Sequence, residues 1–85
     1  MGKVAVTFRI LPDSPEVDTE SLISLISAGV PELKGTAVRP FAFGLQAILA
    51  TVIVPDEGEG FQTVETFLRG LPGVQGVEVE AQSLL

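Results

Sequence analysis

The first part of the chain alternates between apolar and other side chains. In residues 3–11, four large apolar residues fall on one side of an extended chain: Val4, Val6, Phe8 and Ile10. A period of two with β-branched residues is typical of a strand that buries one face. The pattern therefore predicts a first strand over residues 3–11, with its apolar side chains directed toward a core.

Two later segments have the spacing of amphipathic helices. The first is predicted over residues 19–29, after Asp18, a side chain suited to accept hydrogen bonds from the first helical turn. Its apolar residues recur at helical spacing: Leu22, Ile23, Leu25, Ile26 and Val30. The second helix is predicted over residues 60–70, where a similar stripe ends before Gly70 and Pro72: Phe61, Val64, Phe67 and Leu68.

Three more segments are predicted as strands. Residues 33–40 form a weaker one, because Pro40 bends or ends it. Residues 45–54 give the strongest strand signal in the chain. In residues 74–82 the side chains Val74, Val77, Val79 and Ala81 face one way, and Glu78 and Glu80 face the other, toward solvent.

The predicted order is strand–helix–strand–strand–helix–strand. Two right-handed crossovers then give a ferredoxin-like α+β sandwich, a four-stranded antiparallel sheet with two helices on one face. Residues 1–85 are expected to form a single domain, since the chain has only 85 residues. The strands at 3–11 and 45–54 are expected to be central.

The strand at 45–54 is apolar on both faces. One face carries Leu45, Ala47, Leu49, Thr51 and Ile53, and the other carries Gln46, Ile48, Ala50, Val52 and Val54. The helices can cover only one of these faces. The other is predicted to be an apolar surface on the open side of the sheet, unless a partner, a second copy or a terminus covers it.

Two phenylalanines and a glycine precede this strand. Phe41 and Phe43 project the same way if the chain is extended there, and Gly44 permits a bulge or a close backbone approach. The residues alone leave two interpretations open. The segment is either the structural entry to a buried strand or an element that contacts a partner.

The composition removes several kinds of chemistry. The chain has no cysteine and no histidine, which excludes disulfides, thiol nucleophiles, Cys/His zinc sites and histidine acid–base catalysis. Carboxylates cluster at Asp56, Glu57 and Glu59, but their spacing does not match an EF-hand loop and favours a solvated turn. We therefore expect no metal site and no cofactor.

The charge pattern limits the partners. The net charge is −6, and the basic residues are scattered: Lys3, Arg9, Lys34, Arg39 and Arg69. Without a basic patch, direct nucleic-acid binding is not expected. An RNA-recognition module shares the expected fold, but it needs exposed aromatic residues on the central strands, which this chain is not expected to have. The apolar stretches are too interrupted for a membrane-spanning helix. Arg9 also interrupts the first apolar run and no small-residue cleavage site follows it, so we expect a strand there and a cytoplasmic protein.

Four segments resemble a known family: "MGKVAVTFRILPDSPEVD", "RPFAFGLQAI", "VIVPDEGEG" and "LPGVQGVEVEA". In order and spacing they are similar to archaeal translation elongation factor 1-beta, the counterpart of the C-terminal exchange domain of the eukaryotic protein. The most specific part is P-x-A-F-G-L followed by the long apolar strand. The resemblance covers essentially the whole chain and implies the same ferredoxin-like fold.

The resemblance implies guanine nucleotide exchange on elongation factor 1-alpha, a GTPase. In the family the aromatic–glycine loop lies at the GTPase-facing side, so Phe43 and Gly44, with Phe41 beside them, are the implied contact residues. Members commonly carry a basic residue near the C-terminus, and eukaryotic members direct it toward the Mg²⁺ and phosphate region. Here Ser83 and Leu84 stand in that segment, and the resemblance implies that they too contact the GTPase. Gln46 follows "FGL", where the family is usually basic or variable.

A second class of function stays open at this stage. The chain could be a small regulatory or oligomerisation domain that binds a ligand or a second copy through the open sheet face. A weak homodimer through that face is part of this alternative.

Overall fold

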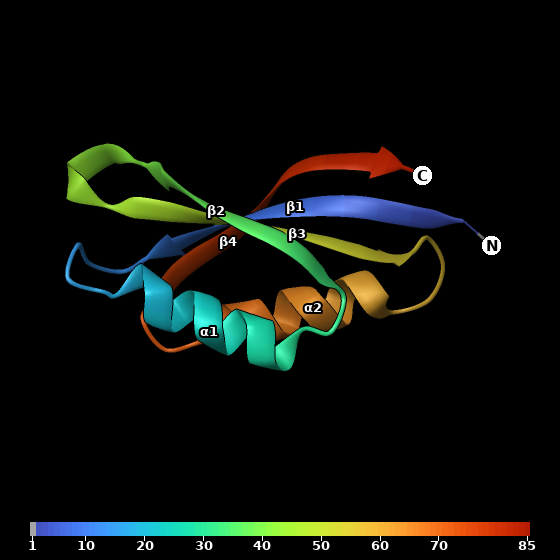
Figure 1. Cartoon of the computed structure of the whole chain (residues 1–85), viewed down its shortest axis with the longest axis horizontal. Helices are drawn as coiled ribbons and strands as arrows, with labels where there is room; N and C mark the ends of the chain where they lie inside the picture. The colour runs from blue at the N-terminus through green and yellow to red at the C-terminus, as the bar shows by residue number, and fades with distance from the viewer. Residues whose placement is uncertain (1) are drawn as a thin grey trace.

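The computed structural model describes residues 2–85. Along the chain lie β1 (Lys3–Pro12), α1 (Thr19–Gly29), β2 (Leu33–Pro40), a short 3₁₀ turn η1 (Ala42–Gly44), β3 (Gln46–Pro55), α2 (Gly60–Arg69) and β4 (Val74–Leu84) (Figure 1). The order of strands and helices is the one that the sequence predicts. The element ends agree within two residues, and η1 was not predicted.

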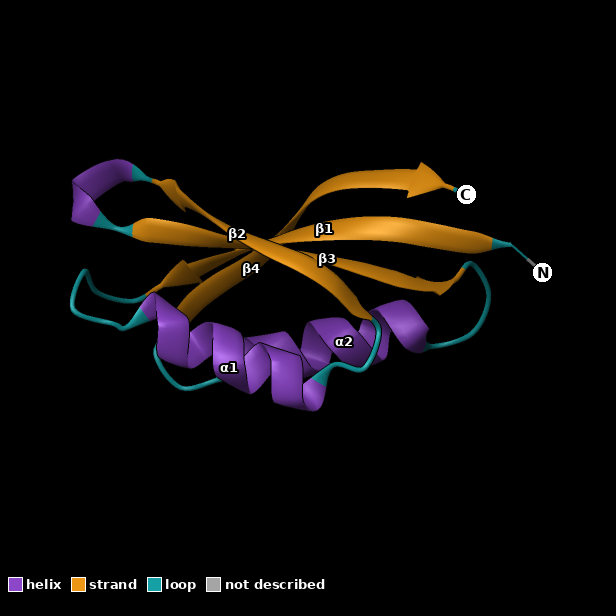
Figure 2. Cartoon of the chain, in the orientation of Figure 1, coloured by secondary structure: helices purple, strands orange, loops and turns teal. Residues whose placement is uncertain are grey.

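The four strands form one antiparallel sheet in the order β2-β3-β1-β4. Both helices lie on the same face of the sheet, and the other face has no helix over it (Figure 2). The ferredoxin-like α+β sandwich is therefore confirmed, with β1 and β3 as the central strands. Because the molecule measures 41 × 20 × 17 Å, the sheet has two well-separated ends.

The core lies between the sheet and the helices. Phe8 and Ile10 of β1 are fully buried, as are Ile26 of α1 and Leu68 of α2. The Phe8 ring lies 5.4 Å from that of Phe61, measured between centroids. Burying aromatic and branched aliphatic side chains in this way is the main source of stability for so small a domain.

The two helices are positioned by local features of the sequence. Asp18 caps α1, because its carboxylate accepts hydrogen bonds from the Glu20 amide at 3.1 Å and the Ser21 hydroxyl at 2.9 Å. At the other end of α1, a Cβ on Gly29 would lie 2.1 Å from Cζ of Phe67 in α2. The missing side chain therefore lets the Phe67 ring pack directly against the α1 backbone.

The two faces of β3 are only partly as predicted. Ile48, Ala50, Val52 and Val54 face the helices and are fully buried, as expected. On the open face Leu49, Thr51 and Ile53 are half-buried and Ala47 is fully buried, although no helix covers them. The predicted apolar open surface is therefore found in part: Leu49 and Ile53 stay partly exposed on it, whereas Ala47 is covered.

A β-bulge in β4 changes which face its last residues occupy. Thr7 pairs with Ala81 and Phe8 pairs with Val79, so Glu80 is the extra residue. Ala81 consequently shares the open face with Thr7. The prediction that it faces the core with Val79 is wrong, because the strict alternation from which it was derived stops at the bulge.

Candidate functional site

The loop that joins β2 to β3 is a tight, hydrogen-bonded hairpin. The Phe41 amide donates to the Leu45 carbonyl at 2.8 Å, and the Leu45 amide donates to the Ala42 carbonyl at 3.2 Å. Between them Phe43 has φ 63° and ψ 29°, and Gly44 has φ 77°. The reversal therefore uses two consecutive residues in the left-handed region.

A phenylalanine in that region is unusual. The left-handed conformation costs a residue with a Cβ roughly 1–2 kcal/mol, and among residues 2–85 only Phe43 adopts positive φ without being glycine. Its side chain is also 91% exposed, so the fold gains no packing from it. Strain of this kind, combined with an exposed aromatic ring, is typical of a contact site for another molecule.

The two phenylalanines of the hairpin have different environments. Phe41 is 39% exposed and lies at the base, whereas Phe43 lies at the tip. The chain is not extended here, because η1 reverses it, so the condition under which both rings would project the same way is not met. Gly44 lies beside the β1–α1 loop, where an added Cβ would be 3.8 Å from Cγ of Pro15.

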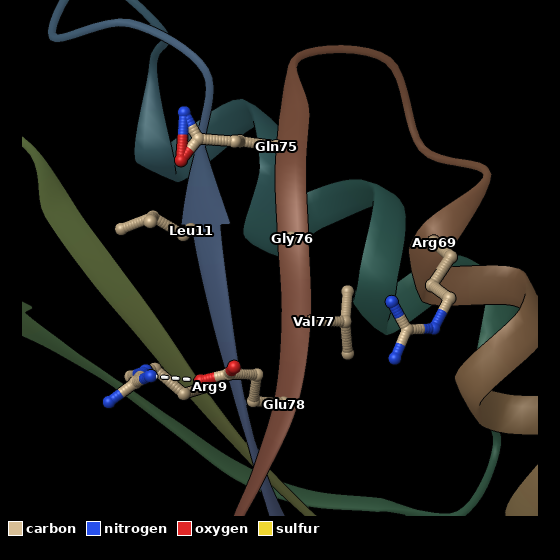
Figure 3. A pocket seen from close by; sticks show the side chains of 7 residues that line it. All are labelled: Arg9, Leu11, Arg69, Gln75, Gly76, Val77 and Glu78. Carbon is tan, nitrogen blue, oxygen red and sulfur yellow. Dashed lines mark hydrogen bonds and ion pairs between the residues drawn. The ribbon is translucent and has the colours of Figure 1, made fainter.

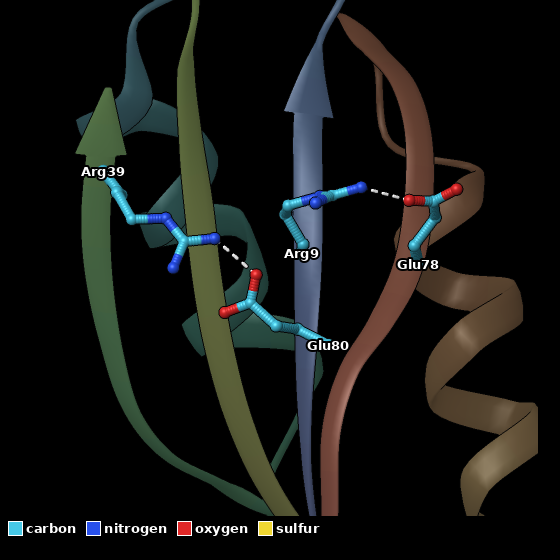
Figure 4. A network of polar contacts seen from close by, with 4 residues as sticks. All are labelled: Arg9, Arg39, Glu78 and Glu80. Atoms are coloured by element: carbon cyan, nitrogen blue, oxygen red, sulfur yellow. Dashed lines mark hydrogen bonds and ion pairs between the residues drawn. The ribbon is translucent and has the colours of Figure 1, made fainter. Parts of the chain in front are cut away.

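Arg9 connects the base of the hairpin to the sheet. Its guanidinium carbon lies 5.4 Å from the centroid of the Phe41 ring, a cation–π arrangement. The same guanidinium group forms an ion pair with Glu78, which lies directly opposite Arg9 on β4 (Figure 4). One chain of contacts thus runs from β4 through β1 to Phe41, the residue that follows β2.

A second ion pair crosses the open face. Arg39 of β2 pairs with Glu80 of β4, although these are the two edge strands. Figure 4 shows the two side chains meeting over the central strands. The Thr7 and Thr51 hydroxyls add a hydrogen bond of 3.0 Å between β1 and β3. The open face therefore carries a polar network, in which Glu78 and Glu80 are exposed, as predicted, and also ion-paired.

Ser83 and Leu84 lie far from the hairpin. They pair with Ala5 and Val4 near the start of β1, and the Leu85 amide donates to the Lys3 carbonyl at 2.9 Å. This places the C-terminal segment at the opposite end of the sheet from η1 (Figure 1). Leu84 is 77% exposed. The predicted contact residues consequently form two groups at opposite ends and not one site.

Two hollows lie near these elements. One, of about 220 Å³, lies beside the hairpin and is lined partly by Pro15, Gly44 and Gln46. The other, of about 380 Å³, wraps around β4, with Arg9 and Arg69 on opposite sides of the strand (Figure 3). Both arginines already have carboxylate partners, Arg69 pairing with Glu65 at 3.3 Å. Neither hollow brings catalytic groups together.

The described residues include no group of three or more carboxylates placed to hold a metal ion. In the same part of the chain, no helix is long and apolar enough to span a bilayer. The feature that distinguishes the surface is the hairpin with its exposed aromatic tip. Fold and site together define a small α+β domain with an exposed aromatic hairpin at one end of its sheet.

The comparisons with known proteins give this domain a family. Residues 5–85 match the family model of the EF-1 guanine nucleotide exchange domain. The chain belongs to this family.

Individual relatives agree. The chain is 41% identical over 83 residues to elongation factor 1-beta of Halobacterium salinarum, covering 94% of each protein. It is 39% identical over 85 residues to elongation factor 1-beta of Methanoculleus marisnigri, covering the full length of both. Among solved structures, the ACT domain of a GTP pyrophosphokinase from Chlorobium tepidum superposes with a TM-score of 0.66 over 91% of this chain and 97% of that one. With 15% identity, that likeness concerns the fold alone.

Proposed function

We propose that this protein promotes release of GDP from elongation factor 1-alpha during translation, and that residues 1–85 act as one exchange domain. The observation that carries the proposal is Phe43, an exposed aromatic held in a strained conformation within the segment that most resembles the family. Aromatic side chains are favoured as binding anchors because they bury a large area at small entropic cost.

Exchange of this kind requires no covalent step. A partner that binds the nucleotide-free GTPase more tightly than the GDP-bound form must weaken GDP binding by the same factor. The protein therefore needs a rigid surface complementary to one state of the GTPase. A chain without histidine and cysteine is compatible with that role, and we propose that it is not an enzyme in its own right.

The two predicted contact groups lie at opposite ends of the sheet, and this separation limits how the GTPase can bind. A GTPase that touches both Phe43 and the Ser83–Leu84 segment must extend along the long axis of the molecule, whose extent is 41 Å. The C-terminal segment brings serine and leucine rather than a cation to its contact. We propose that exchange relies on displacing GTPase loops that hold the phosphates, and not on repelling Mg²⁺ with a basic side chain.

The remaining partner assignments follow the same proposal. The protein acts in the cytoplasm, with the GTPase as its partner, and it neither contacts nucleic acid directly nor binds a membrane. Its acidic net charge of −6 supports a protein partner with basic regions. No cofactor takes part on the side of this chain.

The alternative is a small regulatory or oligomerisation domain that binds a ligand or a second copy, as in a weak homodimer, through the open sheet face. A second copy would have to cover the ion pairs of Arg9 and Arg39, or accommodate them at the interface. Burying such charges is costly unless every group keeps a partner. The polar network therefore favours the GTPase proposal over this alternative, which light scattering would test directly.

The test of the proposed function is release of a fluorescent GDP analogue from the cognate elongation factor 1-alpha. Acceleration that saturates with increasing concentration of this protein supports the proposal. Unchanged release at micromolar protein, with no complex formed with the nucleotide-free GTPase, would overturn it.

A further inference from the structure

We propose that Arg9 is a positioning residue that holds the Phe43 hairpin in its binding conformation, and that Glu78 holds Arg9. This inference rests on the proposed function for the consequence in binding. The conformational part stands on this chain alone, from the two contacts that meet at the Arg9 guanidinium group, with Glu78 and with the Phe41 ring.

The first step is the isolation of the hairpin tip. Phe43 and Ala42 are exposed, and Phe43 receives no packing that would select its left-handed conformation. The cross-strand hydrogen bond from Phe41 to Leu45 closes the loop just below the tip. A contact that holds Phe41 in place therefore also determines the position of the hairpin tip.

The second step is the support of Phe41. Its ring lies over the Arg9 guanidinium at 5.4 Å, while Leu45, the residue hydrogen-bonded to it, is buried. Arg9 projects from a central strand, the most constrained part of the sheet. Through its contact with Phe41, Arg9 can therefore hold the base of the hairpin in place relative to the sheet.

The third step is the orientation of Arg9. A guanidinium group on a half-exposed side chain has several rotamers, and most would leave the Phe41 ring uncovered. The ion pair with Glu78 selects one of them. Arg39 and Glu80 form a second pair across the same face, and Arg39 immediately precedes Pro40 at the end of β2. The Arg39–Glu80 pair thus links β2, the strand that enters the hairpin, to β4, while the Arg9–Glu78 pair links β1 to β4.

The test compares Arg9→Met, Arg9→Lys and Glu78→Gln with the wild type. Methionine keeps an apolar stem but removes the charge, whereas lysine keeps a cation that can lie over the ring. Arg69→Met is the matched control, because it removes a similar ion pair on α2 away from the hairpin. Two readouts are needed: NMR shifts and the HN–Hα coupling of residues 42–45, and affinity for nucleotide-free elongation factor 1-alpha.

We expect Arg9→Met and Glu78→Gln to move the residue 42–45 signals toward values for a mobile loop and to weaken binding several-fold. Arg9→Lys should restore part of both, and Arg69→Met should match the wild type in both. A positioning role is overturned if Arg9→Met leaves the signals of residues 42–45 unchanged. It is also overturned if the loop loosens while affinity stays at the wild-type value.

The two proposals fail in different ways. If the wild type does not bind the GTPase at all, the proposed function fails, while the NMR comparison still decides whether Arg9 positions the hairpin. If Arg9→Met does not fold, Glu78→Gln decides the question, because it leaves Arg9 in place and removes only its carboxylate partner.

Discussion

Arg39 and Glu80 lie on the two edge strands of the sheet and still form an ion pair, with their side chains reaching across both central strands. The contact depends on the bulge in β4, where Glu80 is the extra residue between the positions that pair with Thr7 and Phe8. It crosses a face that would otherwise expose apolar side chains of β3. The Arg39–Glu80 ion pair therefore joins the two edge strands across the open face of the sheet.

The Arg39–Glu80 ion pair should contribute little to the free energy of unfolding. Arg39 is half-exposed, and exposed ion pairs are typically worth about 0.2–1 kcal/mol. We expect Arg39→Met to lower the free energy of unfolding by no more than about 1 kcal/mol, as measured by urea denaturation. The loss should shrink in high salt, which screens exposed charges. A loss of several kcal/mol would mean that the pair organises the fold itself.

Replacing Phe43 at the hairpin tip should affect stability and binding affinity in opposite directions. Asparagine tolerates the left-handed region better than phenylalanine does. Phe43→Asn should therefore leave the protein as stable as the wild type or more stable by up to about 1 kcal/mol, because it relieves backbone strain. The same change should weaken binding to elongation factor 1-alpha by at least about tenfold, since it removes an aromatic anchor.

Thermal or chemical denaturation gives the first quantity and titration of the nucleotide-free GTPase gives the second. Destabilisation by Phe43→Asn would show that the exposed ring supports the fold in a way that its 91% exposure does not suggest.

Gly44 should be sensitive for a purely conformational reason. Its φ is 77°, and an added Cβ would come no closer than 3.8 Å to the nearest atom, on Pro15. Gly44→Ala should therefore cost roughly 1–2 kcal/mol of stability from backbone strain, without a steric clash. Gly35→Ala is the matched control, because a Cβ there meets nothing within 4 Å and φ is not positive. Equal effects of the two changes on the midpoint of denaturation would contradict this explanation.

Gly29 should be sensitive for a steric reason. A Cβ at this position would lie 2.1 Å from Cζ of Phe67, so the ring must move. Gly29→Ala should destabilise the protein by about 1–3 kcal/mol, the usual cost of overpacking, even though alanine favours helix. Phe67→Leu removes the ring and should reduce the penalty of the alanine. A double-mutant cycle measured by denaturation would reveal this coupling, and strict additivity would exclude it.

Hydrophobic periodicity was sufficient to predict the fold because the pattern changes cleanly along the chain. Val4, Val6, Phe8 and Ile10 alternate and are all directed to the helix side of β1. The apolar stripes of α1 and α2 likewise include the buried positions Leu22, Ile26, Val64 and Leu68, although Leu25 and Phe67 of the same stripes are exposed. Each of these positions is determined by local spacing and by the need to bury one face.

The functional surface was harder to predict from the sequence, because it depends on contacts between residues that are far apart in the chain. The bulge at Glu80 and the register between β1 and β4 bring the Arg9 and Arg39 side chains to their carboxylates, and neither is encoded in a periodic pattern. The "FAFG" segment indicated a special loop through Gly44. It could not indicate that Phe43 also adopts a left-handed conformation, because that preference is rare for an aromatic residue.

The central claim is that this protein accelerates GDP release from elongation factor 1-alpha through the exposed ring of Phe43. The most direct test compares nucleotide release driven by the wild type, by Phe43→Asn and by Leu25→Ala, which alters another exposed apolar side chain, on α1. We predict saturable acceleration by the wild type and by Leu25→Ala, and a loss of about tenfold or more in apparent affinity for Phe43→Asn. Equal activity of Phe43→Asn and the wild type would contradict the claim.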